Sequence, residues 1–415
     1  MVHDHFIFAP LRVALVSGGL KLGGSTTFLC NLGGELVRRG IPVEVFSFEF
    51  ENPLASEFNR LNVPVILQDD RRQIFEDRLS AILLRLRQFQ PTVVLACLSA
   101  VSFEVLRYLP SGVLRIGLVQ SHDPAVYQMA RFYTAHLDAI VGVSRTIQET
   151  LEAMPEFTQI RALYLPYGVP MPETIPAADL PSEAPLRILY LGRLEHEQKR
   201  VRLFPKILEQ LKVSGIPFHW TIAGDGSEKD FLRSGMKSGA DQTVSFPGTV
   251  PYAEVPHVLS RHDIFLLASD YEGLPLSLLE AMGWGLVPVV SDLTSGIREL
   301  VDETTGKRVN PENLDGYAQE IIWLHYHRAE MARIRQNARA KVQREFSVTA
   351  MTDRWLKSLP STNRAIEWPK RWSIRPPLTM PRPVYFSPPM RILRRLALRL
   401  RPRPNSTESL PNNRR

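Results

Sequence analysis

Two glutamates seven residues apart stand out in the segment SDYEGLPLSLLEAMGWGLVPVVSD, residues 269–292. The segment follows the apolar run IFLLAS, and its turn opens an apolar, helix-like stretch. This pattern predicts a helix with Glu272 at its entrance and Glu280 about two turns inside. Backbone N–H groups of the first turn, around residues 274–277, would form an anion site. A partly buried carboxylate such as Glu280 needs hydrogen-bond partners, and sugar hydroxyls would serve.

The elements that must position these glutamates form two series. Apolar, β-branched runs at residues 12–16, 43–48, 92–98, 114–120 and 138–144 are separated by helical patterns. A second series starts with LRILYLGRL (186–194), which echoes LRVALVSGG (11–19). Short apolar strands alternating with helices are typical of parallel sheets buried on both faces. We therefore predict an α/β protein with two doubly wound halves and a cleft facing the carboxyl ends of both sheets.

A proline-rich segment separates the two series and indicates a linker. At 415 residues the chain also exceeds the size of a comfortable single core. We expect an N-terminal domain over 1–170, the linker over 171–185 and a C-terminal domain over 186–345. The next segment, 346–360, is expected to be a helix that returns toward the N-terminal domain.

The positive charge of the chain lies in a tail. Residues 365–415 contain 12 lysines and arginines against two acidic residues, whereas the remainder holds 38 basic and 41 acidic residues. Ten prolines fall in the same segment, so we expect residues 361–415 to be largely disordered. A nucleic-acid-binding function would depend on this tail alone, and we expect no nucleic-acid partner.

One part of the tail has a helical pattern, MRILRRLALRL at residues 390–400. Ile392, Leu393 and Leu396 fall on one helical face, and the arginines fall mostly on the other. Such a helix suits an anionic membrane surface, so residues 390–401 are a candidate for peripheral membrane contact. The alternatives are a solvated basic tail or a helix docked back onto the protein.

Cysteine content and hydropathy limit the location of the protein. Two cysteines give no disulfide framework and suit a reducing cytoplasm. The N-terminus lacks the pattern of a signal peptide, and no apolar run is long enough to span a membrane. We expect a cytoplasmic protein, in peripheral contact with the inner face of the plasma membrane if the tail helix binds lipid.

The stretch VSGGLKLGGSTTF, residues 16–28, looks like a phosphate loop without its lysine. Gly18 and Gly23 have the spacing of a P-loop, but Gly24 occupies the lysine position. This departure argues against a P-loop NTPase. The sequence also has no D-x-D pair near a strand end and no cysteine–histidine cluster with zinc spacing.

Taken together, the segment 269–292 and the upstream ILYLGRLEHEQKRV, TIAGDGSEKDFL and VSFPGTV resemble the donor-site signature of the retaining GT-B glycosyltransferases of the glycosyltransferase 4 family. The resemblance covers residues 11 to 357, strongly in the second half and weakly in the first. It implies two Rossmann-like domains around a cleft. It also implies transfer of a glycosyl group from a nucleotide diphosphate sugar to an acceptor hydroxyl, giving an α product without metal or cofactor.

The resemblance also implies roles for individual residues. Glu272 would contact the donor sugar in the reaction zone and Glu280 the ribose hydroxyls. Arg193 and Lys199 would hold the diphosphate, as an arginine fork and a point charge. His122, in LVQSHDP, matches a histidine that lines the sugar pocket, and it completes the catalytic candidates.

The remaining implied contacts come from backbone and small residues. Val250, in the segment GTV, would contact the base. The diphosphate would also meet backbone at five positions, namely Gly23, Gly24, Gly273, Leu274 and Pro275. Gly18 and Gly19 are interpreted as merely ending the first strand. The positive charge missing from the glycine loop is expected across the cleft, at Lys199 and Arg193.

The implied partners are a nucleotide sugar donor and a saccharide or lipid-linked acceptor in polysaccharide, lipopolysaccharide or glycolipid synthesis. No nucleophile is evident, so a front-face path in which the leaving phosphate helps deprotonate the acceptor is the working hypothesis. The alternative is a catalytically inactive sugar-binding or scaffold subunit. The presence of Arg193, Lys199, Glu272 and Glu280 argues against that alternative.

Overall fold

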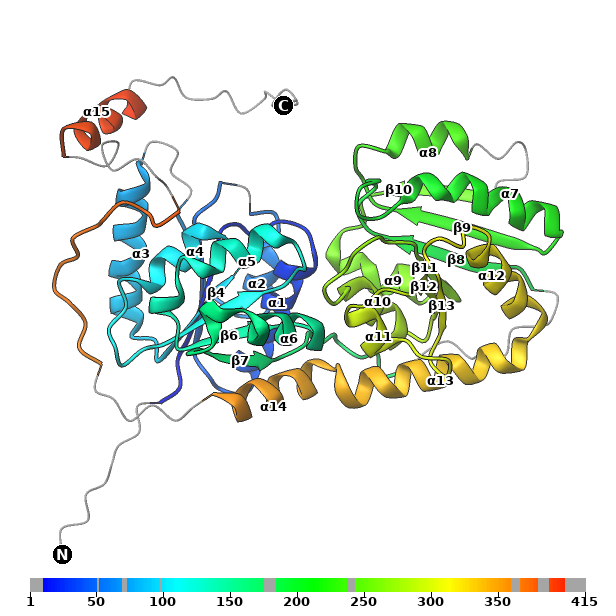
Figure 1. Ribbon diagram of the computed structural model, residues 1–415, viewed down its shortest axis with the longest axis horizontal. Helices are drawn as coiled ribbons and strands as arrows, with labels where there is room; N and C mark the ends of the chain where they lie inside the picture. The colour runs from blue at the N-terminus through cyan, green and yellow to red at the C-terminus, as the bar shows by residue number, and fades with distance from the viewer. Residues whose placement is uncertain are drawn as a thin grey trace, which may run out of the picture.

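The alternating apolar runs form the strands of two separate parallel sheets. The computed structural model describes residues 10–50, 52–68, 73–97, 99–174, 184–236, 243–359, 366–379 and 388–399. Figure 1 shows the two sheets with their helices as neighbouring domains, the first in blue to green and the second in green to yellow. The predicted α/β class with two doubly wound halves is confirmed.

The first sheet has seven parallel strands in the order β3-β2-β1-β4-β5-β6-β7. Its strands are β1 (Val13–Ser17), β2 (Val43–Ser47), β3 (Val65–Leu67), β4 (Val93–Cys97), β5 (Leu114–Val119), β6 (Ala139–Gly142) and β7 (Arg161–Tyr164). The helices between them are α1 (Gly24–Arg38), α2 (Ala55–Arg60), α3 (Phe75–Phe89), α4 (Ala100–Leu106), α5 (Pro124–Arg131) and α6 (Arg145–Ala153). Every residue of β1, β2 and β4 is buried, because helices cover both faces of the sheet.

The second sheet has six parallel strands in the order β10-β9-β8-β11-β12-β13. They are β8 (Leu186–Leu191), β9 (Phe218–Ala223), β10 (Val244–Gly248), β11 (Ile264–Leu267), β12 (Val287–Ser291) and β13 (Lys307–Val309). The helices of this domain are α7 (Phe204–Ser214), α8 (Lys229–Gly235), α9 (Val255–Leu259), α10 (Leu276–Gly283), α11 (Gly296–Leu300) and α12 (Gly316–Tyr326).

Each sheet has one point where the chain reverses its direction of winding. These switch points lie between β1 and β4 in the first sheet and between β8 and β11 in the second. The loops that leave neighbouring strands there run to opposite sides, which opens a crevice at the carboxyl ends. The loop before Gly23 follows β1, Arg193 follows β8 and Glu272 follows β11, so all three come from such crevices.

Two consecutive helices connect the domains along one side. α13 (Arg328–Glu345) belongs to the second domain, and α14 (Val348–Ser358) lies beneath the first (Figure 1). At the junction Val169 forms a β-bridge with Ser347. On the first domain, Asp353 of α14 accepts a hydrogen bond from Arg39 at 2.5 Å.

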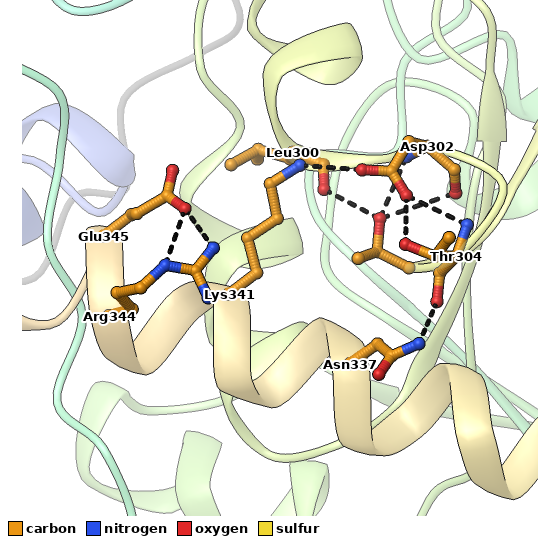
Figure 2. Close-up of polar contacts among 8 residues, drawn as sticks. Leu300, Asp302, Thr304, Asn337, Lys341, Arg344 and Glu345 are labelled. Carbon is orange, nitrogen blue, oxygen red and sulfur yellow. Dashed lines mark hydrogen bonds and ion pairs between the residues drawn. The ribbon is translucent and has the colours of Figure 1, made fainter.

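Polar contacts fasten α13 to the second domain (Figure 2). Lys341 donates to Asp302 at 3.1 Å, and Asn337 donates to the carbonyl of Thr304 at 3.1 Å. Burial alone would raise the pKa of Asp302, but hydrogen bonds from Thr304 and Lys341 lower it to about 2. α13, which leads into α14 beneath the first domain, is therefore anchored through an ionised carboxylate.

The described parts of the tail pack against the first domain, in contrast to the expected disorder. Trp372 donates to the carbonyl of Tyr108 at 3.1 Å, and Ile374 is buried. Residues 388–399 form α15 (Pro388–Arg399), which lies beside α3 (Figure 1). The expectation of disorder did not take into account the large apolar side chains that lie between the prolines, such as Trp372 and Ile374. Residues 361–365, 380–387 and 400–415 of the tail, and 175–183 of the expected linker, lie outside the described residues.

Candidate active site

A cavity of about 500 Å³ lies between the two domains at the carboxyl ends of both sheets. The first domain contributes the start of α1 and the residues after β5. The second contributes the loops after β8 and β11 and the start of α10. Of the residues singled out from the sequence, those lining this cavity are Gly23, Gly24, Arg193, Lys199, Val250, Glu272, Gly273, Leu274, Pro275 and Glu280.

The N-termini of α1 and α10 meet at this cavity. An ideal Cβ on Gly24, the first residue of α1, would lie 3.2 Å from the Cβ of Leu276, the first residue of α10. Gly23 precedes α1 with a φ of 149°, a conformation that residues with side chains rarely adopt. Both helices direct free backbone N–H groups and the positive ends of their dipoles toward the same space. The cavity is therefore suited to an anionic group such as a diphosphate.

Lys199 and Glu272 form a buried ion pair within the cavity wall. The Lys199 Nζ lies 2.6 Å from Glu272 Oε1, and their side chains are 13% and 6% exposed. Ser269 donates a second hydrogen bond to the same oxygen at 2.7 Å. Because Lys199 comes from the loop after β8 and Glu272 from the loop after β11, the two loops are joined across the switch point. The pair holds each side chain in place against the other.

Arg193 is held less tightly at the rim. Its guanidinium donates to Glu195 at 2.8 Å and to Gln198 at 2.7 Å, but its side chain is 65% exposed. Its backbone carbonyl accepts a hydrogen bond from Tyr190. The backbone is thus fixed while the guanidinium can turn toward a ligand. A planar fork of this kind can grip a phosphate through two hydrogen bonds.

Glu280 has no ion-pair or hydrogen-bond partner for its carboxylate among the described residues. It lies in the middle of α10 and faces the cavity. Burial raises its pKa to about 8. An unpaired carboxylate in an apolar setting is costly unless a ligand supplies donors. Hydroxyl groups would do so.

His122 is the one predicted site residue that does not line this cavity. Its neighbours Gln120 and Ser121 do. The His122 Nδ1 lies 3.1 Å from the Tyr127 hydroxyl, and Nε2 is buried without a hydrogen bond in the described part of the chain. Burial lowers the pKa of His122 and so favours the neutral ring. The structure puts the histidine behind the cavity wall, and its catalytic role stays a prediction.

Other residues of the cavity were missed by the sequence reasoning. Gln120 is buried, and within the described segments its amide makes no hydrogen bond of normal geometry, although the Tyr167 hydroxyl lies beside it. Tyr252 reaches from the second domain to the first, where its hydroxyl donates to Asn31 at 3.0 Å. Tyr252 belongs to none of the motifs quoted from the sequence, whereas Gln120 lies within LVQSHDP. A polar residue directly after a buried strand was the only signal for Gln120.

A second cavity of about 270 Å³ adjoins the first and shares Gly23 and Gln120 with it. It lies wholly in the first domain and contains the Glu49 carboxylate, which pairs with Lys21 at 2.9 Å. Gly18 and Gly19 form one wall. An ideal Cβ there would lie 2.8 Å from Ser99 Oγ and 2.9 Å from Glu49 Oε2, respectively. These glycines therefore do more than end β1, because side chains would displace the polar groups of this cavity.

Within the described residues no group of three or more histidine, cysteine, aspartate or glutamate side chains is arranged to hold a metal ion. No helix among them is long and apolar enough to cross a bilayer. The positive charge of the large cavity comes from Lys199, Arg193 and the two helix N-termini.

Both halves of this architecture match one family of enzymes. Residues 22–169 match the family model described as Glycosyltransferase Family 4, and residues 185–327 match the one described as Glycosyl transferases group 1. The chain belongs to glycosyltransferase family 4. The predicted family is thus confirmed, and its two models divide the chain as the two sheets do.

Curated relatives of this family 4 member come from bacterial polysaccharide synthesis. The chain is 34% identical over 189 residues to the putative colanic acid biosynthesis glycosyltransferase WcaL of Escherichia coli, covering 43% of this chain and 46% of the relative. It is 36% identical over 171 residues to the amylovoran biosynthesis glycosyltransferase AmsK of Erwinia amylovora, covering 39% and 42%. The alignments thus span about half the length of these relatives.

Solved structures of the same fold cover more of the chain. TarM of S. aureus, in a complex containing UDP, superposes with a TM-score of 0.69 at 12% identity, over 84% of this chain and 99% of that one. HepE of Anabaena, in complex with UDP-glucose, gives 0.65 at 16% identity, over 84% and 100%. These likenesses show the GT-B fold of the family 4 chain, as predicted.

Proposed function

We propose that this family 4 member transfers a glycosyl group from a nucleotide diphosphate sugar to an acceptor hydroxyl with retention of the α configuration. One observation carries the proposal. Two cationic side chains and two helix N-termini converge on a cavity that also holds two carboxylates, one paired and one without a partner among the described residues. A diphosphate matches the positive groups, and the hydroxyls of ribose and sugar match the carboxylates.

The donor is proposed to lie along α10. The diphosphate would occupy the space before the helix N-termini, with Arg193 and Lys199 as counter-charges. The ribose hydroxyls would donate to Glu280, and the base would lie by Val250, which lines the same cavity. The sugar would then lie toward Glu272. The TarM structure contains UDP and the HepE structure UDP-glucose, so uridine sugars are the first donors to test.

The acceptor is proposed to enter through the second cavity, which opens next to the donor site. Glu49 and Ser99 offer hydrogen-bond acceptors for sugar hydroxyls there. The acceptor would be a saccharide or a lipid-linked saccharide of envelope polysaccharide, lipopolysaccharide or glycolipid synthesis, in line with the colanic acid and amylovoran relatives. The enzyme would work in the cytoplasm, in peripheral contact with the inner face of the plasma membrane through residues 390–401.

In the proposed step, the bond between the anomeric carbon and the diphosphate oxygen breaks. The acceptor oxygen forms a bond to the same face of that carbon, and its proton passes to the departing phosphate oxygen. The protein would stabilise the charge on the diphosphate through Lys199, Arg193 and the helix N-termini. Glu272 would orient the sugar and stabilise positive charge at the anomeric centre.

Transfer assays with UDP, GDP and ADP sugars test the proposal. Glu272→Ala should lower kcat by at least about a hundredfold, the scale of losing a transition-state contact, while the nucleotide still binds. Glu209→Gln, on the exposed side of α7, should leave the rate unchanged. The NMR anomeric coupling of the product should show an α linkage.

Near-normal transfer by the Glu272→Ala variant would refute the assignment of that residue, and a β product would refute retention. Binding of nucleotide sugars without turnover, across acceptors that include lipid-linked saccharides, would favour the sugar-binding subunit instead.

A further inference from the structure

α15 lies outside the segments that match the family models, and it presents its apolar side away from the protein. Ile392, Leu393 and Leu396 are 57%, 57% and 51% exposed. These three residues lie on one face of the helix, the exposed apolar face. A helix docked on a soluble protein normally buries such a face and exposes its charges. Here the orientation is reversed.

Ion pairs with α3 account for the reversed orientation. Arg391 and Arg394 both pair with Glu76, which is buried, and Arg395 pairs with Asp77. The arginines of the helix therefore face the first turn of α3, where the two acidic residues also favour the helix dipole. Arg391 donates a further hydrogen bond to the carbonyl of Ile374, in the packed part of the tail.

We propose that the exposed apolar face of α15 is a membrane-docking surface that inserts into the acyl-chain boundary of an anionic bilayer. The transfer of leucine and isoleucine side chains from water to lipid is favourable, because it removes their apolar surface from water. In an isolated interfacial helix the polar side faces water. In α15 the polar side instead faces the protein, through the arginines that pair with α3. Arg375 is exposed and adjoins Ile374, whose carbonyl accepts a hydrogen bond from Arg391 of α15. The sequence from residue 365 onward holds 12 basic residues against two acidic ones, and this charge complements anionic headgroups.

The location of α15 connects this surface to the acceptor cavity. The first turn of α3 lies at the carboxyl end of the first sheet, because α3 follows β3. Arg78 of α3 donates to the carbonyl of Phe48 at 2.7 Å, next to Glu49 of the second cavity. Docking through α15 would thus bring the second cavity close to the bilayer. This deepens the proposed function, because a lipid-linked acceptor would reach the cavity from the membrane.

Vesicle flotation of the full chain tests the surface. Vesicles of phosphatidylglycerol and phosphatidylcholine in equal parts should carry the wild-type protein upward at physiological salt. The variant Leu393→Ser/Leu396→Ser should bind at least tenfold more weakly. The matched control is Val213→Ser, which replaces an exposed aliphatic residue on α7 and should float like the wild type.

Two further results decide the interpretation. If the wild type fails to float, or the double variant floats equally well, the proposal is wrong. If the double variant converts a dimer to a monomer and leaves flotation unchanged, the face is instead an interface between two copies. Transfer to a soluble acceptor should be the same for wild type and double variant. A failure of flotation is therefore distinguishable from a failure of the proposed transferase activity.

Discussion

The unpartnered Glu280 makes nucleotide binding dependent on pH in a predictable direction. In the free protein burial raises its pKa to about 8. Ribose hydroxyls donate hydrogen bonds, so they prefer the ionised carboxylate and should lower that pKa when they bind. Binding should therefore release a proton at neutral pH and become tighter as the pH rises toward 9.

The size of the effect follows from the position of the pKa. A carboxyl group with a pKa of about 8 is ionised in about one molecule in ten at pH 7 and about nine in ten at pH 9. If only the carboxylate accepts from the ribose, the Kd falls by about tenfold over this range, or about 1.4 kcal/mol. At pH 7 close to one proton leaves for each nucleotide bound.

Isothermal titration calorimetry with a nucleoside diphosphate measures both quantities. Titrations at pH 7, 8 and 9 give the Kd, and buffers of different ionisation enthalpy give the number of protons released. Working above pH 7 keeps the phosphates of the ligand ionised, since their last pKa is about 6. Glu280→Gln should abolish the proton release and flatten the Kd over the same range. Glu209→Gln should behave like the wild type.

A Kd that does not change between pH 7 and pH 9, with no proton released, would refute this reasoning. So would a Glu280→Gln variant that keeps the wild-type pH dependence. The free protein gives an independent check. A pKa raised from 4.5 stabilises the protonated form, so this stability is complete below pH 4.5 and is lost as the pH rises through about 8. Above pH 8, Glu280→Gln should raise the free energy of unfolding, with an upper bound of about 5 kcal/mol.

Three further predictions concern a contact between the domains, the glycine loop and the anchor of α13. Glu299→Ala removes the carboxylate that accepts from the Tyr164 hydroxyl of the other domain at 2.7 Å, and X-ray scattering should then show a larger radius of gyration without nucleotide. Gly23→Ala forces a side chain into a φ of 149°, so the strain of about 1–3 kcal/mol should lower the free energy of unfolding in urea by that amount. Lys341→Met removes a donor that lowers the pKa of Asp302 to about 2. Because Asp302 is half exposed, the loss in urea unfolding at pH 7 should be about 0.5 kcal/mol, disappearing as the pH falls from 3.8 toward 2.

Much of the fold could be predicted because buried parallel strands have a simple sequence signature. β4, which is buried throughout, is an unbroken apolar run, and β2 departs from this pattern only by buried polar residues such as Glu44, which is paired with Arg85. The turn and helix around Glu272 were equally predictable, because the determinants are local in sequence. Lys199 and Gly23 line one cavity although they are far apart along the chain. That expectation came from the resemblance to the glycosyltransferase 4 family and not from any local pattern.

Contacts between distant residues had no such signature. Glu76 and Arg394 are separated by more than 300 positions. Each lies in a helical pattern, α3 or α15, that gives no sign of a contact with the other. The tail arginines therefore suggested a helix with its charges free to meet lipid, whereas the structure pairs them with α3. The second cavity was missed for the same reason. Glu49, Ser99 and Gln120 each follow a different strand, and only the order of strands brings them together.

The ion pair between Lys199 and Glu272 links the binding of the donor diphosphate to the freedom of Glu272 to contact the sugar. In the free protein each side chain neutralises the other, so neither is available without disrupting a contact of 2.6 Å. A diphosphate that draws Lys199 away would leave Glu272 held by Ser269 and free to face the sugar. Truncating Glu272 would release Lys199 for the phosphate and so strengthen nucleotide binding while it abolishes transfer. A loss of both together would mean that Glu272 holds the lysine in place for the phosphate, and that the pair is a fixed part of the phosphate site.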